Sequence, residues 1–124
     1  MTQQSLKWTL SLQVQGGPAV NQTGTLNVDD YDSIALSLLG GANKTVAIPG
    51  LANLVKFILV TSDNPKKVTF TPTGGAAQVL DPMLILTGAG AISLLGNPPG
   101  NVRFTNTDAT NPVNVQILVG RNES

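Results

Sequence analysis

The chain alternates between apolar and polar residues over much of its length. Near the amino end the apolar positions are Leu6, Trp8, Leu10, Leu12 and Val14, and near the carboxyl end they are Val113, Val115, Ile117 and Val119. Period-two alternation places successive side chains on opposite faces of a strand, so that one face packs on a core and the other meets water. We therefore predict strands over Ser5–Val14 and Pro112–Gly120, with the even-numbered residues of the first strand facing the core.

Further apolar runs follow one another between these ends, separated by Gly, Pro, Asn and Asp. They predict about eight to ten short strands, at the spacing typical of a sandwich or barrel. No helical period persists long enough to predict a helix. Parallel strands would need long crossover connections, so the pairing is expected to be antiparallel. The prediction is an all-β chain with a single antiparallel β-sandwich of jelly-roll type over residues 1–124.

Two segments carry more apolar residues than one small core obviously requires. Leu54–Thr61 is apolar on both faces, which predicts a central strand covered on both sides or a strand that also meets another protein. Pro82–Gly100 contains no charged residue and includes a predicted short strand at Ala91–Leu95. From these segments we predict four residues at an oligomer or partner interface, namely Leu54, Ile58, Leu94 and Leu95.

A short motif occurs twice. The letters ALSLLG at Ala35–Gly40 are followed by AISLLG at Ala91–Gly96, at an offset of 56 residues. One interpretation is a two-fold pseudo-repeat of β-units, as in the two Greek keys of a jelly roll. The other is a chance match between short segments rich in Leu, Ser and Gly.

The chemistry available to the chain is narrow. It has no His and no Cys, which excludes Ser–His and Cys–His nucleophiles, disulfides and thiolate metal sites. Lys plus Arg and Asp plus Glu number 7 each, so a basic face for nucleic acid is not expected. No apolar stretch approaches the roughly 20 residues of a membrane helix, and the first residues do not form a signal peptide. We predict a non-enzymatic protein made in the cytosol of the cell that produces it, without cofactor, nucleic acid or membrane.

The acidic residues lie at predicted turns and termini, where an Asp side chain stabilises the turn by bonding nearby backbone. The densest group is Asp29, Asp30 and Asp32, a candidate calcium site because calcium prefers clustered carboxylate oxygens. The segment lacks the Gly and the distal Glu of an EF-hand loop. A solvated turn is therefore the favoured interpretation.

Charged residues make up only 11% of the chain, against about 25% in an ordinary soluble domain. Two copies of a protein with so few charges repel each other weakly, and its surface can be buried at low desolvation cost. This favours an assembly subunit over a monomer. The polar terminal segments, residues 1–4 and 121–124, are either arms that order on binding or frayed ends. Aromatic residues are 4%, and only Tyr31 is expected in a loop, so a carbohydrate-binding module is the less favoured alternative.

The neutral, Cys- and His-free composition, the Thr/Asn/Gly-rich loops and the closing strand PVNVQILVG at Pro112–Gly120 resemble small structural proteins of tailed-phage virions. The nearest kind is the jelly-roll-like capsid decoration, or cement, protein. The resemblance implies a virion protein that binds the major capsid protein or another virion protein on the outer shell, as a homo-oligomer with a trimer favoured. It implies no particular site residues. A tail- or fibre-associated virion protein is the first alternative.

Overall fold

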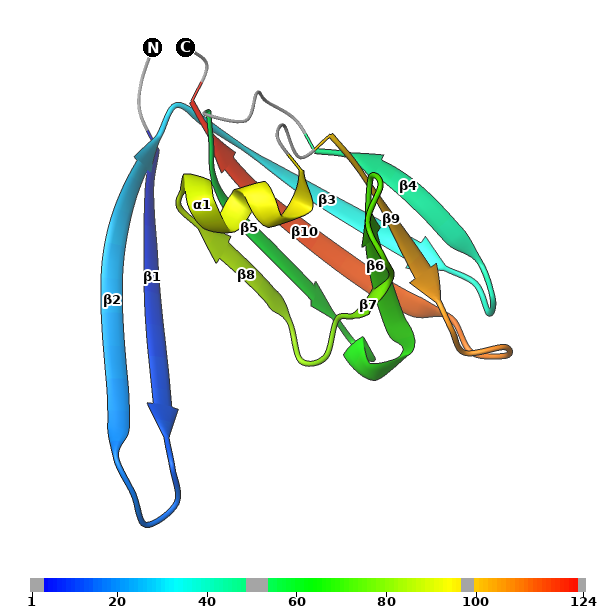
Figure 1. The fold of residues 1–124 in the computed structure, drawn as a ribbon, viewed down its shortest axis with the longest axis horizontal. Helices are drawn as coiled ribbons and strands as arrows, with labels where there is room; N and C mark the ends of the chain where they lie inside the picture. The colour runs from blue at the N-terminus through cyan, green and yellow to red at the C-terminus, as the bar shows by residue number, and fades with distance from the viewer. Residues whose placement is uncertain (1–3, 49–53, 97–99, 123–124) are drawn as a thin grey trace.

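A computed structural model describes residues 4–48, 54–96 and 100–122 of the chain. These residues form two facing four-stranded sheets and a separate two-stranded hairpin (Figure 1). Every strand pair in the described ranges is antiparallel. The prediction of an antiparallel β-sandwich is therefore confirmed.

The hairpin consists of β1 (Gln4–Gln13) and β2 (Ala19–Val28). The sheet beside it, here called the near sheet, has the order β3 (Asp30–Leu38), β10 (Val113–Arg121), β5 (Val55–Ser62) and β8 (Leu84–Thr87). The opposite sheet, called the far sheet, has the order β4 (Asn43–Ala47), β9 (Asn101–Asn106), β6 (Val68–Pro72) and β7 (Gln78–Val79). The short helical segments are η1 (Pro65–Lys67), α1 (Ala89–Ile92) and η2 (Ser93–Leu95). None of the helices in the described ranges has the length and hydropathy needed to cross a membrane.

The main core lies between the two sheets. The alternation predicted for the last strand is confirmed, since β10 buries every second residue, and each is 1% exposed or less: Val113, Val115, Ile117 and Val119. Phe104 of β9 enters the same core from the far sheet. Burying this side-chain set supplies the main driving force for joining the sheets.

The strand β5 lies between β10 and β8 and is covered on both sides, as the apolar run at Leu54–Thr61 predicts. Ile58 and Val60 face the core between the sheets. Phe57 is also buried, but it belongs to a second contact, on the side of the near sheet that meets the hairpin. The two apolar faces of β5 therefore serve two different packing layers.

The predicted strand at Ala91–Leu95 is wrong, because this segment is helical. Gly88 and Gly96 flank it with positive φ angles, and the Ile92 amide donates to the Gly88 carbonyl. Ile92 and Leu95 are three positions apart and are both buried, which is a helical spacing. Packing of this turn against β5 and β8 overrides the strand propensity of its residues.

The pseudo-repeat fails at the same place. The first copy of the motif lies in β3, where Leu36 and Leu38 are buried with a period of two. The second copy forms α1 and η2. Nearly identical letters therefore adopt different structures, and the chance-match interpretation accounts for them.

Asn106 is the buried polar residue of the described core, at 1% exposure. Its Nδ2 donates to the carbonyl oxygens of Leu38, Leu39 and Asn111, and its Oδ1 accepts from the Asp108 amide. These bonds tie the end of β3 to the loop between β9 and β10. The buried amide is thus fully used in holding loop backbone.

Candidate functional site

The base of the hairpin is packed on the near sheet at a glycine. A Cβ built on Gly120 would lie 3.3 Å from Val28 Cγ1, 3.5 Å from Leu6 Cδ1 and 3.6 Å from Phe57 Cβ. The absence of a side chain at Gly120 allows residues from β1, β2 and β5 to meet over β10. This small apolar contact fixes where the hairpin leaves the sandwich.

One step along the hairpin, Trp8 covers Gly24 on the neighbouring strand. The two residues are paired in the β1–β2 register, and a Cβ at Gly24 would overlap the indole ring. An aromatic ring over a cross-strand glycine shields backbone that would otherwise be open to water. The half-buried indole is the last hairpin side chain held by the sandwich before the hairpin becomes exposed.

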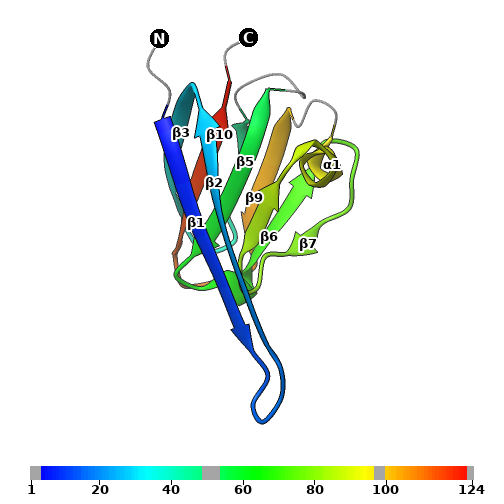
Figure 2. The ribbon, with the colours of Figure 1, turned by 90° about the vertical axis from the view of Figure 1, so that its left-hand side faces the viewer.

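The distal hairpin, defined as Thr9–Thr23, projects beyond the sandwich (Figures 1 and 2). Every residue in it is exposed. One face nevertheless carries large apolar side chains, with these exposed fractions: Leu10 37%, Leu12 57%, Val14 62% and Val20 48%. Leu12 lies directly opposite Val20, so these residues form one stripe.

The prediction that the even-numbered residues of Ser5–Val14 all face the core is therefore wrong for the outer half of the strand. A strand of ten residues is about 33 Å long. Only Leu6 and Trp8 lie over the near sheet deeply enough to be partly buried. The alternation identifies the apolar face of the hairpin correctly, but most of that face has nothing beneath it.

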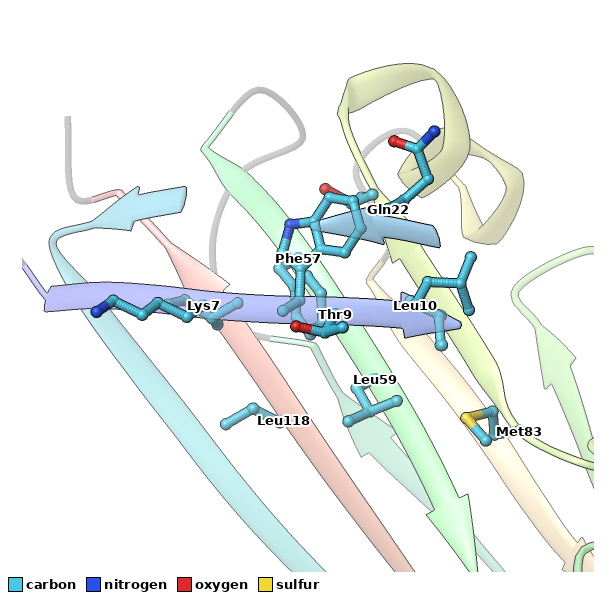
Figure 3. Close-up of a pocket in the computed structure, with 12 residues that line it drawn as sticks. Lys7, Thr9, Leu10, Gln22, Phe57, Leu59, Met83 and Leu118 are labelled. Carbon is cyan, nitrogen blue, oxygen red and sulfur yellow. The ribbon is translucent and has the colours of Figure 1, made fainter. Parts of the chain in front are cut away.

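A groove of about 570 Å³ lies between the hairpin and the outer surface of the near sheet (Figure 3). We call it the hairpin groove. Its residues on the hairpin are Leu6, Lys7, Trp8, Thr9, Leu10 and Gln22, and its residues on the sandwich are Phe57, Leu59, Met83, Ile85, Thr87 and Leu118. Met83 and Ile85 are still 47% and 45% exposed. The floor is apolar, and Lys7 is the one charged side chain in the lining.

The outer surface of the far sheet has the opposite character. Thr45, Arg103 and Thr71 lie side by side across β4, β9 and β6, and Thr105 and Thr69 form the next row. Thr45, Arg103 and Thr71 line a shallow depression that contains no aromatic side chain. The two outer surfaces of the sandwich thus differ, one being hydroxyl-rich and the other apolar and partly roofed by the hairpin.

The acidic triplet proposed for calcium is engaged with an arginine. Arg121 Nε lies 2.9 Å from Asp32 Oδ2, and Arg121 NH2 lies 3.2 Å from Asp30 Oδ2. The Asp29 backbone amide donates to the Arg121 carbonyl and to Asn122 Oδ1. Among the described residues no group of three His, Cys, Asp or Glu could hold a metal ion. The cluster therefore joins the start of β3 to the end of β10. Arg121 and Asn122, the first two residues of the predicted carboxyl-terminal arm, are part of the fold.

The four predicted interface residues are separated by the structure. Ile58 and Leu95 are 0% and 3% exposed and belong to the core of the single chain. Leu54 is half-buried, whereas Leu94 is 73% exposed next to Leu95. Ile58 and Leu95 are thus core rather than surface residues, and an interface role for Leu54 and Leu94 stays a prediction.

Two carboxylates hold loops through hydrogen bonds. The backbone amides of Thr110 and then Asn111 donate to Asp108 Oδ1 and lower the pKa of Asp108 to about 2. The backbone amide of Asn114 donates to Asp63 Oδ1 and is the largest cause of the lowered pKa of Asp63. Stabilisation of the charged form makes both groups weak proton acceptors, and their bonds are those of turn-forming residues.

A comparison of the chain with models of known protein families finds no match, and a comparison with curated protein sequences finds no significant match. Functional inference therefore depends on the surfaces just described. The distal hairpin was not among the candidate sites predicted from the sequence. The signal that could have identified it is the turn Gly16-Gly17-Pro18 between two long runs of low charge, which pair with each other in the structure.

Proposed function

We propose that this chain is a non-enzymatic structural protein of a phage virion, acting as a capsid decoration protein that binds the outer shell and stabilises it. The observation that carries the proposal is the distal hairpin, which projects from the sandwich (Figure 1) and exposes a stripe of Leu and Val side chains. Exposed apolar surface of this kind is typical of a protein–protein contact. The carboxylates of Asp30, Asp32, Asp63 and Asp108, by contrast, hold loops and strand ends together.

We also infer that the sandwich is of jelly-roll type. The strand order supports this inference, because β3 pairs with β10, β4 with β9, β5 with β8 and β6 with β7. These nested pairs correspond to one long antiparallel ribbon folded over itself, with eight strands in two sheets. Such a scaffold keeps the hairpin and the two outer surfaces in fixed relative positions.

The physical basis of shell stabilisation is mass action. A protein that binds the assembled shell but not its free subunits stabilises the shell by its binding free energy. Many copies of a modest contact add up when neighbouring sites are linked. A neutral chain with 11% charged residues has surfaces that can be buried against protein at low desolvation cost.

The test uses particles of the phage that encodes the chain, purified with and without its gene. We expect the chain on the outer shell in many copies in an electron cryomicroscopy map, and we expect particles lacking it to open at a lower temperature. Adding back the purified protein should restore the thermal stability. Location in the tail or fibres, or equal stability of the two particle types, would contradict the proposal.

A further inference from the structure

We propose that the distal hairpin of one copy of this chain docks into the hairpin groove of a second copy. The inference rests on the proposed function only in treating the hairpin as the contact element. It does not depend on which shell the protein binds. The partner of the apolar stripe is then a second copy of the chain, and the receiving surface is the hairpin groove of that copy.

The first reason is that the distal hairpin is incomplete as a folded unit. A two-stranded hairpin exposed to water on both sides is marginally stable at best. Leu12, Val14 and Val20 nevertheless place their side chains on one face, where they remain about half exposed or more. Covering this face by a third layer would give the hairpin the packing that its base already has.

The second reason is that the chain contains a surface known to accept this face. At the hairpin base, Leu6 of the same apolar face lies over Gly120 of the near sheet, beside Phe57, and both Leu6 and Phe57 line the groove. The groove continues from there along the near sheet to Met83 and Ile85, which are still about half exposed. Exposed apolar side chains thus continue beyond this contact on both surfaces, along the hairpin and along the near sheet.

The third reason is geometric. The hairpin crosses the outer side of the near sheet and then leaves the sandwich (Figure 2). The residues around Leu12, Val14 and Val20 do not line the groove of their own chain. Because the hairpin tip and the groove are different parts of one copy, each tip can occupy the groove of another copy in a two-fold dimer or a closed ring.

The fourth reason is charge. The distal hairpin, Thr9–Thr23, contains no charged residue, and Lys7 is the one charged side chain in the groove lining. The two surfaces therefore lack the charges that would attract a strongly acidic or basic partner. Two neutral copies approach each other without like-charge repulsion, and specificity comes from shape and apolar contact.

The first experiment measures the oligomeric state of the purified chain by sedimentation, without capsids. We expect the wild type to sediment as an oligomer at a multiple of the monomer mass. Leu12→Asp should raise the dissociation constant by at least about tenfold, since it places a charge in an apolar contact. Gln13→Asp adds the same charge to the adjacent residue on the opposite face and should leave the oligomer unchanged. Circular dichroism of each variant verifies that the sandwich is folded.

The second experiment locates the receiving surface. The chain has no cysteine, so single cysteines introduced at Leu12 and Ile85 have no competing native thiol. Mixing Leu12→Cys protein with Ile85→Cys protein under mild oxidation should give a disulfide-linked heterodimer in excess over either variant alone. Mixing Gln13→Cys protein with Ile85→Cys protein is the matched control and should give little product.

The outcomes separate this inference from the proposed function. Oligomers that depend on Leu12, from a protein that ignores capsids, support the inference and contradict the decoration role. A protein that stays monomeric at its highest soluble concentration, but loses capsid binding when Leu12→Asp is introduced, overturns the inference and makes the shell the occupant of the hairpin contact. Oligomers that are indifferent to Leu12→Asp, with no disulfide formed between the Leu12→Cys and Ile85→Cys proteins, also overturn it.

Discussion

The indole of Trp8 lies across Gly24, close enough that a single added methyl group at Gly24 would overlap the ring. This pair stands where the hairpin leaves the sandwich, and Trp8 also lines the hairpin groove. The glycine therefore determines the shape of the groove through the ring that it accommodates.

Replacing Gly24 with Ala should displace the indole toward solvent, because the new Cβ cannot share the position of the ring. Trp8 is the one tryptophan of the chain, so its fluorescence reports the change directly. We expect a red-shifted emission maximum in Gly24→Ala. Thr25→Ala, on the opposite face of the same strand, is the control and should leave the emission unchanged. An unshifted spectrum in Gly24→Ala would contradict the placement of the ring.

Replacing Gly120 with Val should loosen the hairpin base from the near sheet. The added side chain meets Leu6, Val28 and Phe57, and overpacking of this kind costs about 1–3 kcal/mol of unfolding free energy. Hydrogen exchange of the β1 and β2 amides should become faster, while exchange in the main core should change less. Gln116→Val, on the same outward face of β10, is the matched control. Equal protection of the hairpin amides in both variants would show that Gly120 does not support the hairpin.

Adjacent leucines in η2 should respond oppositely to a charge. Leu95 is 3% exposed and Leu94 is 73% exposed. Leu95→Asp buries an unpaired carboxylate and should lower the unfolding free energy by several kcal/mol or prevent folding, at about the scale known for buried charges. Leu94→Asp should fold with nearly wild-type stability, as measured by chemical denaturation. If Leu94→Asp changes the oligomeric state without unfolding the monomer, the predicted interface role of Leu94 is supported.

Calcium should have no effect on thermal unfolding. The carboxylates of Asp30 and Asp32 are paired with Arg121, so a cation would have to displace the guanidinium. We expect the same Tm in calcium and in a chelator. Arg121→Gln should lower the free energy of unfolding at low salt by only about 1 kcal/mol or less for each broken ion pair, since both pairs are partly exposed. A Tm that rises with calcium would restore the metal-site interpretation of this cluster.

Acid should destabilise the fold in a range set partly by Asp108. Its pKa in the fold is about 2, below the ordinary value of 3.8, because the amides of Thr110 and Asn111 donate to the carboxylate. The native state binds fewer protons than the unfolded state in this interval. The stabilisation is therefore complete above the ordinary pKa and is lost as the pH falls toward about 2.

Asp108→Asn should flatten this acid dependence in urea unfolding measured across the interval, because Asn does not titrate. The remaining slope should include Asp63, whose pKa is lowered in the same direction. Parallel stability curves for Asp108→Asn and the wild type would show that the loop carboxylate does not contribute.

The sequence alone determines the fold class and the position of most strands. The reason is that alternation depends on local geometry, and the core strands β3, β9 and β10 alternate, with β10 as the clearest case. The central position of Leu54–Thr61 is also visible in the sequence, because a strand covered on both sides must be apolar on both faces.

The tertiary structure decided the rest, because a pattern of apolar positions says which face is to be covered but not what covers it. Ser5–Val14 alternates as regularly as the last strand, yet its outer half lies beyond the sandwich and remains exposed. Ala91–Leu95 has nearly the letters of a segment in β3, but its packing against β5 and β8 favours a helical turn. The pairing of Asp32 and Asp30 with Arg121 joins residues 89 and 91 positions apart in the sequence, and only the β3–β10 register brings them together.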